Sequence, residues 1–163
     1  MSRIQLALNV DDLDASIAFY STLFDTTAAK VKPGYANFAV TEPPLKLVLI
    51  ENAGRGGSLN HLGIEVETVD VVDSSQQRLA AAGLASVDQR GSTCCYATQD
   101  KFWVEGAPDG ETWEVYTVLA DSATFGEGRD DFTMTACCSD TAVTSDDADE
   151  RATATNTTTT ACC

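Results

Sequence analysis

The pattern of apolar and polar positions divides the first half of the chain into four elements. Alternation over residues 3–10 (RIQLALNV) predicts a strand. Apolar residues at helical spacing over 11–24, with acids near the start, predict a helix. Short apolar runs at 35–40 (YANFAV) and 45–51 (LKLVLIE) predict two further strands, and the glycine-rich stretch 52–58 is typical of a linker.

The same order of elements begins again after the linker. Residues 60–66 (NHLGIEV) predict a strand and residues 68–84 a helix. Strands are then expected at 94–100, 101–107 and 112–118, the last two separated by the turn sequence PDGE. The order β-α-β-β(-β) therefore occurs twice, with QLALNV and HLGIEV in equivalent positions.

This repeat predicts an α+β fold. We expect two tandem βαβββ modules, at about residues 2–52 and 58–120, whose curved, mostly antiparallel sheets enclose a cleft. The alternative is a ferredoxin-like α+β domain without internal duplication. The predicted domain covers residues 1–124, and residues 125–163 form a tail.

Composition restricts the function classes. A chain of 163 residues is long enough for one domain with a substantial core. Its formal net charge of −15 argues against nucleic acid or an anionic membrane surface as a partner. The sequence has no apolar run long enough to span a membrane and does not begin like a signal peptide, so we predict a cytoplasmic protein.

The tail differs from the rest of the chain in composition. Residues 121–163 carry nine acids and two bases, and the segment is rich in Thr, Asp and Ala. Few large apolar residues remain to offset the entropy of ordering, so we expect disorder from about residue 126.

The six cysteines form three adjacent pairs. A cytoplasmic location and the spacing argue against a disulfide framework, and a C-x-x-C zinc arrangement is absent. Binding of a soft metal or metalloid is therefore the favoured interpretation. For the first pair the alternative is two buried thiols on opposite sides of a strand. The pairs are Cys94–Cys95, Cys137–Cys138 and Cys162–Cys163.

Three polar side chains interrupt strands that are otherwise apolar. Gln5 and His61 occupy the first strands of the two modules, and Glu114 lies in the last strand. A lone histidine is more often structural than a metal ligand. Together, however, an amide oxygen, an imidazole nitrogen and a carboxylate can bind one metal ion and leave coordination positions open for substrate and dioxygen or water. This set is similar to the two-His-one-carboxylate arrangement of non-haem Fe(II) oxygenases, and Mn, Co, Ni or Zn would also suit it.

These motifs resemble the vicinal oxygen chelate superfamily, which includes glyoxalases, extradiol dioxygenases and bleomycin resistance proteins. More narrowly, NHLGIEV, TCCYATQDKFWV and DGETWEVYTVLAD are similar to the organoarsenical carbon–arsenic lyases and the related cadmium-inducible proteins. The resemblance covers about residues 2–124.

The resemblance implies Fe(II)- and O2-dependent cleavage of the C–As bond in trivalent methyl or aryl arsenicals, which gives arsenite. It implies Gln5, His61 and Glu114 as iron ligands, and Cys94 and Cys95 as catalytic thiols that bind As(III). The tail pairs would be accessory thiols, and a homodimer is compatible with the sequence.

Both thiols can grip one atom only if the backbone at 93–95 is not extended, because neighbouring residues of a strand point to opposite faces. We therefore expect a loop at Cys94, made flexible by Gly91 and Ser92.

Four further side chains are candidates around the cleft. Tyr35 and Phe38 are expected to wall the pocket against the organic group of the substrate. Lys101 and Gln99 fit either the cleft or the surface.

Two other functions remain open. The cysteine pairs suit a non-catalytic protein that sequesters Cd(II) or As(III), although this leaves Gln5, His61 and Glu114 without a role. A glyoxalase-like or drug-resistance metalloenzyme would use the same metal cleft but has no need of adjacent cysteines.

Overall fold

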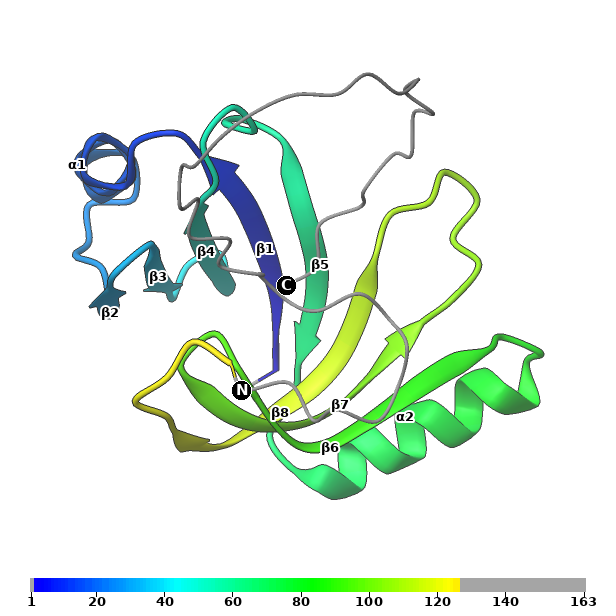
Figure 1. Ribbon diagram of the computed structural model, residues 1–163. Helices are drawn as coiled ribbons and strands as arrows, with labels where there is room; N and C mark the ends of the chain where they lie inside the picture. The colour runs from blue at the N-terminus through cyan, green and yellow to red at the C-terminus, as the bar shows by residue number, and fades with distance from the viewer. Residues whose placement is uncertain (1, 127–163) are drawn as a thin grey trace, which may run out of the picture.

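The two halves of the chain fold in the same order and lie side by side in one curved sheet (Figure 1). The computed structural model describes residues 2–126. The first module comprises β1 (Arg3–Val10), α1 (Leu13–Leu23), β2 (Lys30–Lys32), β3 (Tyr35–Val40) and β4 (Leu45–Glu51). The second comprises β5 (Leu59–Glu65), α2 (Val69–Ala81), β6 (Ser86–Cys94), β7 (Ala97–Val104) and β8 (Trp113–Asp121). The predicted pair of βαβββ modules is confirmed.

Strand pairing repeats between the modules as well. The sheet order is β2-β3-β4-β1-β5-β8-β7-β6. The first strand of each module pairs in parallel with the last strand of the same module, β1 with β4 and β5 with β8. The modules join where β1 and β5 run antiparallel. This mixed sheet agrees with the predicted α+β class.

Both helices pack on the outer face of the sheet, which leaves the inner face open (Figure 1). Asp12 and Thr68 cap the two helices, because their side chains accept bonds from the backbone N–H groups of Ala15 and Val71. α1 covers β3 and β4, and α2 covers β7 and β8, where Phe102 and Val115 are buried. Alternation along the strands therefore directs the neighbouring residues of β7 and β8 to the inner face.

The predicted set of strands needs three corrections. β2 was not expected, since three residues at Lys30–Lys32 are too short for a periodic signal. The strands expected at 94–100 and 101–107 are one strand, Ala97–Val104, and the hairpin partner Ser86–Cys94 was missed. That partner is polar and contains a glycine, so it lacks the apolar pattern that marks a strand.

Among residues 2–126, no helix has the length and hydropathy needed to cross a bilayer. The predicted disorder of the tail concerns residues 127–163, which lie outside the described residues. Phe125, which the prediction assigned to the tail, contacts the folded domain through Tyr35 and Tyr96.

Candidate active site

The three predicted metal ligands come together on the inner face of the sheet. Gln5 (β1), His61 (β5) and Glu114 (β8) are 4%, 3% and 3% exposed. The Gln5 Nε2 atom lies 2.8 Å from His61 Nε2 and 3.0 Å from Glu114 Oε1. The remaining pair, His61 Nε2 and Glu114 Oε1, is separated by 3.4 Å. Side chains that are 56 and 109 residues apart in the sequence therefore converge on one point.

Strand register explains this convergence. Gln5 stands opposite Gly63 on β5, and Gly63 stands opposite Glu114 on β8. Because residue 63 has no side chain, the side chains of its two neighbours can meet across it. A Cβ atom at Gly63 would lie 3.1 Å from Gln5 Cβ and 3.2 Å from the Tyr116 ring. His61 precedes Gly63 by two residues and so shares its face of the sheet.

The spacing of the donor atoms fits a divalent metal ion. A metal–ligand bond of about 2.1 Å puts neighbouring ligands of an octahedral ion roughly 3.0 Å apart. The separations of 2.8, 3.0 and 3.4 Å among Gln5 Nε2, His61 Nε2 and Glu114 Oε1 approximate one face of such an octahedron, with the amide nitrogen at the position that the amide oxygen takes when the group is turned over. Within residues 2–126, no three His, Cys, Asp or Glu side chains gather closely enough to hold an ion, so the amide of Gln5 is needed as third donor.

The imidazole of His61 is oriented by the residue before it. His61 Nδ1 lies 2.7 Å from Asn60 Oδ1, and Asn60 Nδ2 donates to Asn9 Oδ1 at 2.9 Å. An amide oxygen accepts hydrogen bonds, so Nδ1 carries the proton and Nε2 keeps its lone pair. The ring also packs edge-on against Trp103, with centroids 5.6 Å apart. His61 is therefore held with the lone pair of Nε2 directed toward Gln5 and Glu114.

The carboxylate of Glu114 is paired with a buried ammonium group. Lys101 Nζ lies 3.0 Å from Glu114 Oε2, and Lys101 is 2% exposed. Burial opposes ionisation of Glu114, but the Lys101 ammonium outweighs it and keeps the pKa of the carboxyl below its usual value. Burial likewise opposes the charge on Lys101, but Glu114 and the two thiols raise its pKa above the ordinary value. Of the two positions considered for Lys101, the surface is excluded: the side chain is buried against Glu114 and does not itself line the cavity.

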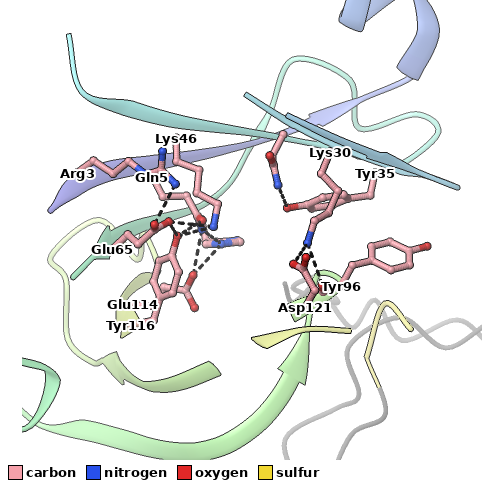
Figure 2. A network of polar contacts seen from close by, with 12 residues as sticks. Arg3, Gln5, Lys30, Tyr35, Lys46, Glu65, Tyr96, Glu114, Tyr116 and Asp121 are labelled. Carbon is pink, nitrogen blue, oxygen red and sulfur yellow. Dashed lines mark hydrogen bonds and ion pairs between the residues drawn. The ribbon is translucent and has the colours of Figure 1, made fainter. Parts of the chain in front are cut away.

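A second polar network of Arg3, Lys46, Glu65 and Tyr116 adjoins the Gln5 amide (Figure 2). The Tyr116 hydroxyl lies 2.6 Å from Gln5 Oε1 and 2.8 Å from Glu65 Oε2. Lys46 Nζ donates to the same hydroxyl at 2.9 Å and pairs with Glu65 Oε2 at 3.0 Å. Arg3 binds the other oxygen of Glu65 at 2.9 Å. Burial and the Glu65 and Glu114 carboxylates raise the pKa of Tyr116, so the phenol stays protonated.

The two thiols lie at the tip of the β6–β7 hairpin. Cys94 is the last residue of β6, and the turn residues Cys95 and Tyr96 have φ values of 55° and 61°. Two consecutive positive φ values are characteristic of a type I′ hairpin turn, which usually contains Asn and Gly. The prediction of a loop at Cys94 is therefore wrong by one residue: the backbone leaves extended geometry at Cys95.

The predicted flexible loop over 91–95 is also incorrect. Gly91 and Ser92 belong to β6, where Gly91 (φ 57°) marks an irregularity in the pairing with β7. The Gly91 N–H donates to Asp100 Oδ1 at 2.7 Å, which fixes this irregularity. The turn at Cys95, rather than a flexible loop, brings the two sulfur atoms together.

The sulfur atoms of Cys94 and Cys95 are 3.3 Å apart. This exceeds the length of a disulfide bond. A soft atom with bonds to sulfur of about 2.3 Å, set roughly at right angles, holds its two sulfurs at about this distance. Cys94 is buried and Cys95 is partly exposed. The geometry favours capture of one atom by both thiols over two thiols on opposite faces of a strand.

The two thiols and two of the candidate metal ligands face one cavity of about 230 Å³. Gln5 and Glu114 line it from one side, and Cys94 and Cys95 from another. His61 is not among the lining residues but contacts the Gln5 amide. The other residues that line it are Arg3, Ala29, Lys30, Tyr35, Asn37, Ala39, Lys46, Val48, Glu65, Ala97, Gln99, Val118 and Asp121.

Aromatic side chains surround the thiol end of the cavity. Tyr35, Tyr96 and Phe125 form a cluster with ring centroids 5.5 to 6.2 Å apart, and Cys95 packs against it. Tyr35 lines the cavity as expected. Phe38 does not, because it belongs to the core beneath α1 on the other face of the sheet.

Gln99 takes the cleft position, and two further residues acquire roles only in the folded chain. Gln99 is buried at the cavity, and its Oε1 atom has no hydrogen-bond partner among the described residues. Asn60 and Tyr116 were not predicted as site residues. Asn60 could have been recognised as a site residue because it directly precedes His61. Tyr116 could have been recognised because strand alternation places it on the same face of the sheet as Glu114. The accessory thiols Cys137, Cys138, Cys162 and Cys163 lie outside the described residues.

Comparison with known proteins supports the resemblance seen in the sequence. The cadmium-induced protein CadI of Mycobacterium tuberculosis is 65% identical over 128 residues, 78% of this chain and 84% of the relative. A trivalent organoarsenical cleaving enzyme of Thermomonospora curvata is 57% identical over 139 residues, 85% of this chain and 89% of that enzyme.

A solved structure shows the same fold at lower identity. The Mn(II)-bound glyoxalase of Novosphingobium aromaticivorans superposes with a TM-score of 0.52 and 20% identity, over 79% of this chain and 44% of that one. Residues 3–115 match the model of the Glyoxalase/Bleomycin resistance protein/Dioxygenase superfamily. With its duplicated modules and its converging donors, the chain belongs to this superfamily.

Proposed function

We propose that the protein is a carbon–arsenic lyase that cleaves trivalent methyl and aryl arsenicals to arsenite with Fe(II) and dioxygen. The observation that carries the proposal is the shared cavity: Gln5 and Glu114, two of the three candidate metal ligands, line it together with the two thiols, and His61 contacts the Gln5 amide. The relative at 57% identity, named for cleavage of trivalent organoarsenicals, supports it.

In this proposal Gln5, His61 and Glu114 hold the metal ion. Their neutral amide and imidazole and single carboxylate suit Fe(II), and Mn(II), Co(II), Ni(II) or Zn(II) can occupy the same set. When bound, iron supplies the redox chemistry with dioxygen that cleavage of the C–As bond requires. Asn60 keeps His61 in the ligand tautomer, and Lys101 holds one oxygen of Glu114, which leaves the other oxygen for the metal.

Cys94 and Cys95 hold the arsenic. Trivalent arsenic is thiophilic, and a thiol reacts as its thiolate. The Lys101 ammonium lies close enough to both thiols to interact with them electrostatically, and a nearby cation favours the thiolate form. The aromatic cluster beside Cys95 offers apolar contacts to a methyl or aryl group. Binding in one cavity supplies the proximity on which the reaction depends.

The test is release of arsenite. Reduced full-length protein is incubated with Fe(II) and methylarsenite or phenylarsenite in air, and arsenite is quantified by chromatography with elemental detection. We expect catalytic turnover in air, and no turnover without oxygen or in His61→Ala. If the wild type binds arsenical one-to-one without releasing arsenite, the lyase proposal is wrong.

The second candidate is non-catalytic binding of a soft metal or metalloid. The short separation of the two sulfur atoms favours it, and the relative at 65% identity is named for induction by cadmium. This function needs no metal at Gln5, His61 and Glu114. It therefore predicts that His61→Ala retains the full binding capacity of the wild type.

A further inference from the structure

The Gln5 amide presents its nitrogen, rather than its oxygen, to the metal ligands. Nε2 lies 2.8 Å from His61 Nε2 and 3.0 Å from Glu114 Oε1, whereas Oε1 lies 2.6 Å from the Tyr116 hydroxyl. An amide nitrogen has no lone pair to offer a cation, so only Oε1 can serve as a ligand. Gln5 must therefore turn its amide by half a rotation about the last side-chain torsion before it can bind a metal.

After this rotation the amide nitrogen faces Tyr116. The Tyr116 hydroxyl must then accept a hydrogen bond from Gln5 instead of donating one, and its own proton needs another acceptor. Glu65 Oε2 lies 2.8 Å from the hydroxyl and can take it. With Lys46 also donating to the hydroxyl at 2.9 Å, the oxygen accepts two bonds and donates one, which is its full capacity.

Glu65 is held in place as this acceptor. Arg3 binds one carboxylate oxygen at 2.9 Å, and Lys46 lies 3.0 Å from the other. Burial opposes ionisation of Glu65, but Lys46, Tyr116 and Arg3 outweigh it and lower its pKa. Glu65 thus remains a charged acceptor on the side of Tyr116 away from the metal ligands (Figure 2).

We propose that Tyr116 is the positioning residue that orients Gln5 as an oxygen ligand, by redirecting its hydroxyl proton from Gln5 to Glu65. This inference rests on the metal site of the proposed function. It gives Tyr116, Glu65 and Lys46 a shared role, because together they provide a hydrogen-bond partner for the Gln5 amide in either of its two orientations. Groups that orient a ligand in this way commonly change metal affinity by about 10- to 100-fold when removed.

The test is an anaerobic Co(II) titration of the full chain, followed by the visible absorption of the bound ion. We expect Tyr116→Phe to raise the Co(II) Kd by about tenfold or more. Tyr35→Phe is the matched control. It also removes a buried hydroxyl at the same cavity, bonded to Asn37 at 2.8 Å, and keeps the ring. We expect its Co(II) Kd to equal that of the wild type.

A double-mutant cycle separates positioning from a merely structural role. If Tyr116 acts through Gln5, then Tyr116→Phe weakens Co(II) binding in the wild type and has no further effect in a Gln5→Ala background. An equal loss in both backgrounds would overturn the inference. Should Tyr116→Phe fail to fold, Glu65→Met removes the alternative acceptor while Tyr116 stays, and we expect it to weaken Co(II) binding similarly.

The outcomes distinguish this inference from the proposed function. If the wild type binds no Co(II), the metal site itself is wrong. If the wild type binds one Co(II) and both Tyr116→Phe and Glu65→Met bind it equally tightly, the metal site stands and the positioning role of Tyr116 is wrong.

Discussion

Gln5 and Glu114 make contact across an intervening strand, with Gln5 Nε2 3.0 Å from Glu114 Oε1, because Gly63 between them has no side chain. The proposed metal site therefore depends on a residue that supplies no ligand to it. The glycine lets β1 and β8, from different modules, act as neighbours on the inner face of the sheet. The same close approach lets Tyr116 reach the other end of the Gln5 amide.

This relationship predicts the effect of Gly63→Ala. The added methyl group would lie 3.1 Å from Gln5 Cβ and 3.2 Å from both Gln5 Nε2 and the Tyr116 ring, tighter than ordinary packing. We expect a loss of about 1–3 kcal/mol in the free energy of unfolding. Co(II) binding should weaken as well, because Gln5 is displaced. Urea unfolding and Co(II) titration measure the two effects, and wild-type Co(II) affinity would contradict the account.

The turn at the thiols predicts that a substitution of Cys95 can preserve the stability of the fold while it abolishes arsenical binding. Residue 95 has φ 55°, a conformation that disfavours most side chains but is tolerated by Asn. We expect Cys95→Asn to leave the free energy of unfolding unchanged or raise it by up to about 1 kcal/mol, and to abolish tight arsenical binding. Denaturant unfolding and arsenical titration measure both quantities.

Cys94→Asn is the matched control for that prediction. Cys94 is a buried strand residue, so a polar side chain there should destabilise the protein by about 1–3 kcal/mol while also abolishing arsenical binding. Equal changes of stability in the two variants would contradict the role assigned to the turn.

The buried ion pair between Lys101 and Glu114 predicts that a bound metal ion can compensate for the loss of the Lys101 charge. Lys101→Met leaves the Glu114 carboxylate buried without its ammonium partner, and we expect a cost of about 3–5 kcal/mol in the metal-free protein. A divalent ion restores positive charge beside the carboxylate. Co(II) should therefore bind more tightly to Lys101→Met and raise its Tm more than that of the wild type.

Lys30→Met provides the control for Lys101→Met. Lys30 pairs with Asp121, whose side chain is 81% exposed, so the variant should lose about 1 kcal/mol or less and respond to Co(II) as the wild type does. The charge compensation is disproved if Co(II) raises the Tm of both lysine variants equally.

The carboxylate of Glu65 predicts a pH dependence of stability. Burial opposes its ionisation, but Lys46, Tyr116 and Arg3 lower its pKa below the ordinary value of 4.5. A lowered pKa stabilises the folded state above pH 4.5, and this contribution is lost as the pH falls through the folded-state pKa. We expect the free energy of unfolding of Glu65→Gln to fall less steeply below about pH 4.5 than that of the wild type. Parallel curves for the two proteins would show that Glu65 contributes nothing to the acid dependence.

Much of the fold and the chemical groups of the site could be predicted from the sequence. The repeat of apolar strands and helices identified the two modules, and polar residues inside such strands identified Gln5, His61 and Glu114. These signals depend only on residues that are close together in the sequence, so they can be recognised without knowledge of the fold. Cys94 and Cys95 were likewise conspicuous because thiols seldom adjoin.

What could not be predicted depends on register between strands. That Gly63 stands between Gln5 and Glu114 follows from the pairing of β1, β5 and β8, which no local pattern encodes. The contact of Tyr116 with Gln5 arises from the same pairing, whereas Asn60 contacts its sequence neighbour His61. The strand Ser86–Cys94 escaped prediction because its stability comes from its partner Ala97–Val104 rather than from its own composition.

The central claim is that one cavity brings a metal ion and a thiol-bound arsenic together. The most direct test is a crystal structure of the full chain loaded without oxygen with Co(II) and phenylarsenite. We predict cobalt on Gln5, His61 and Glu114, arsenic bonded to the sulfurs of Cys94 and Cys95, and both open to the same cavity. Cobalt bound by the thiols instead of these three ligands, or arsenic outside the cavity, would contradict the account.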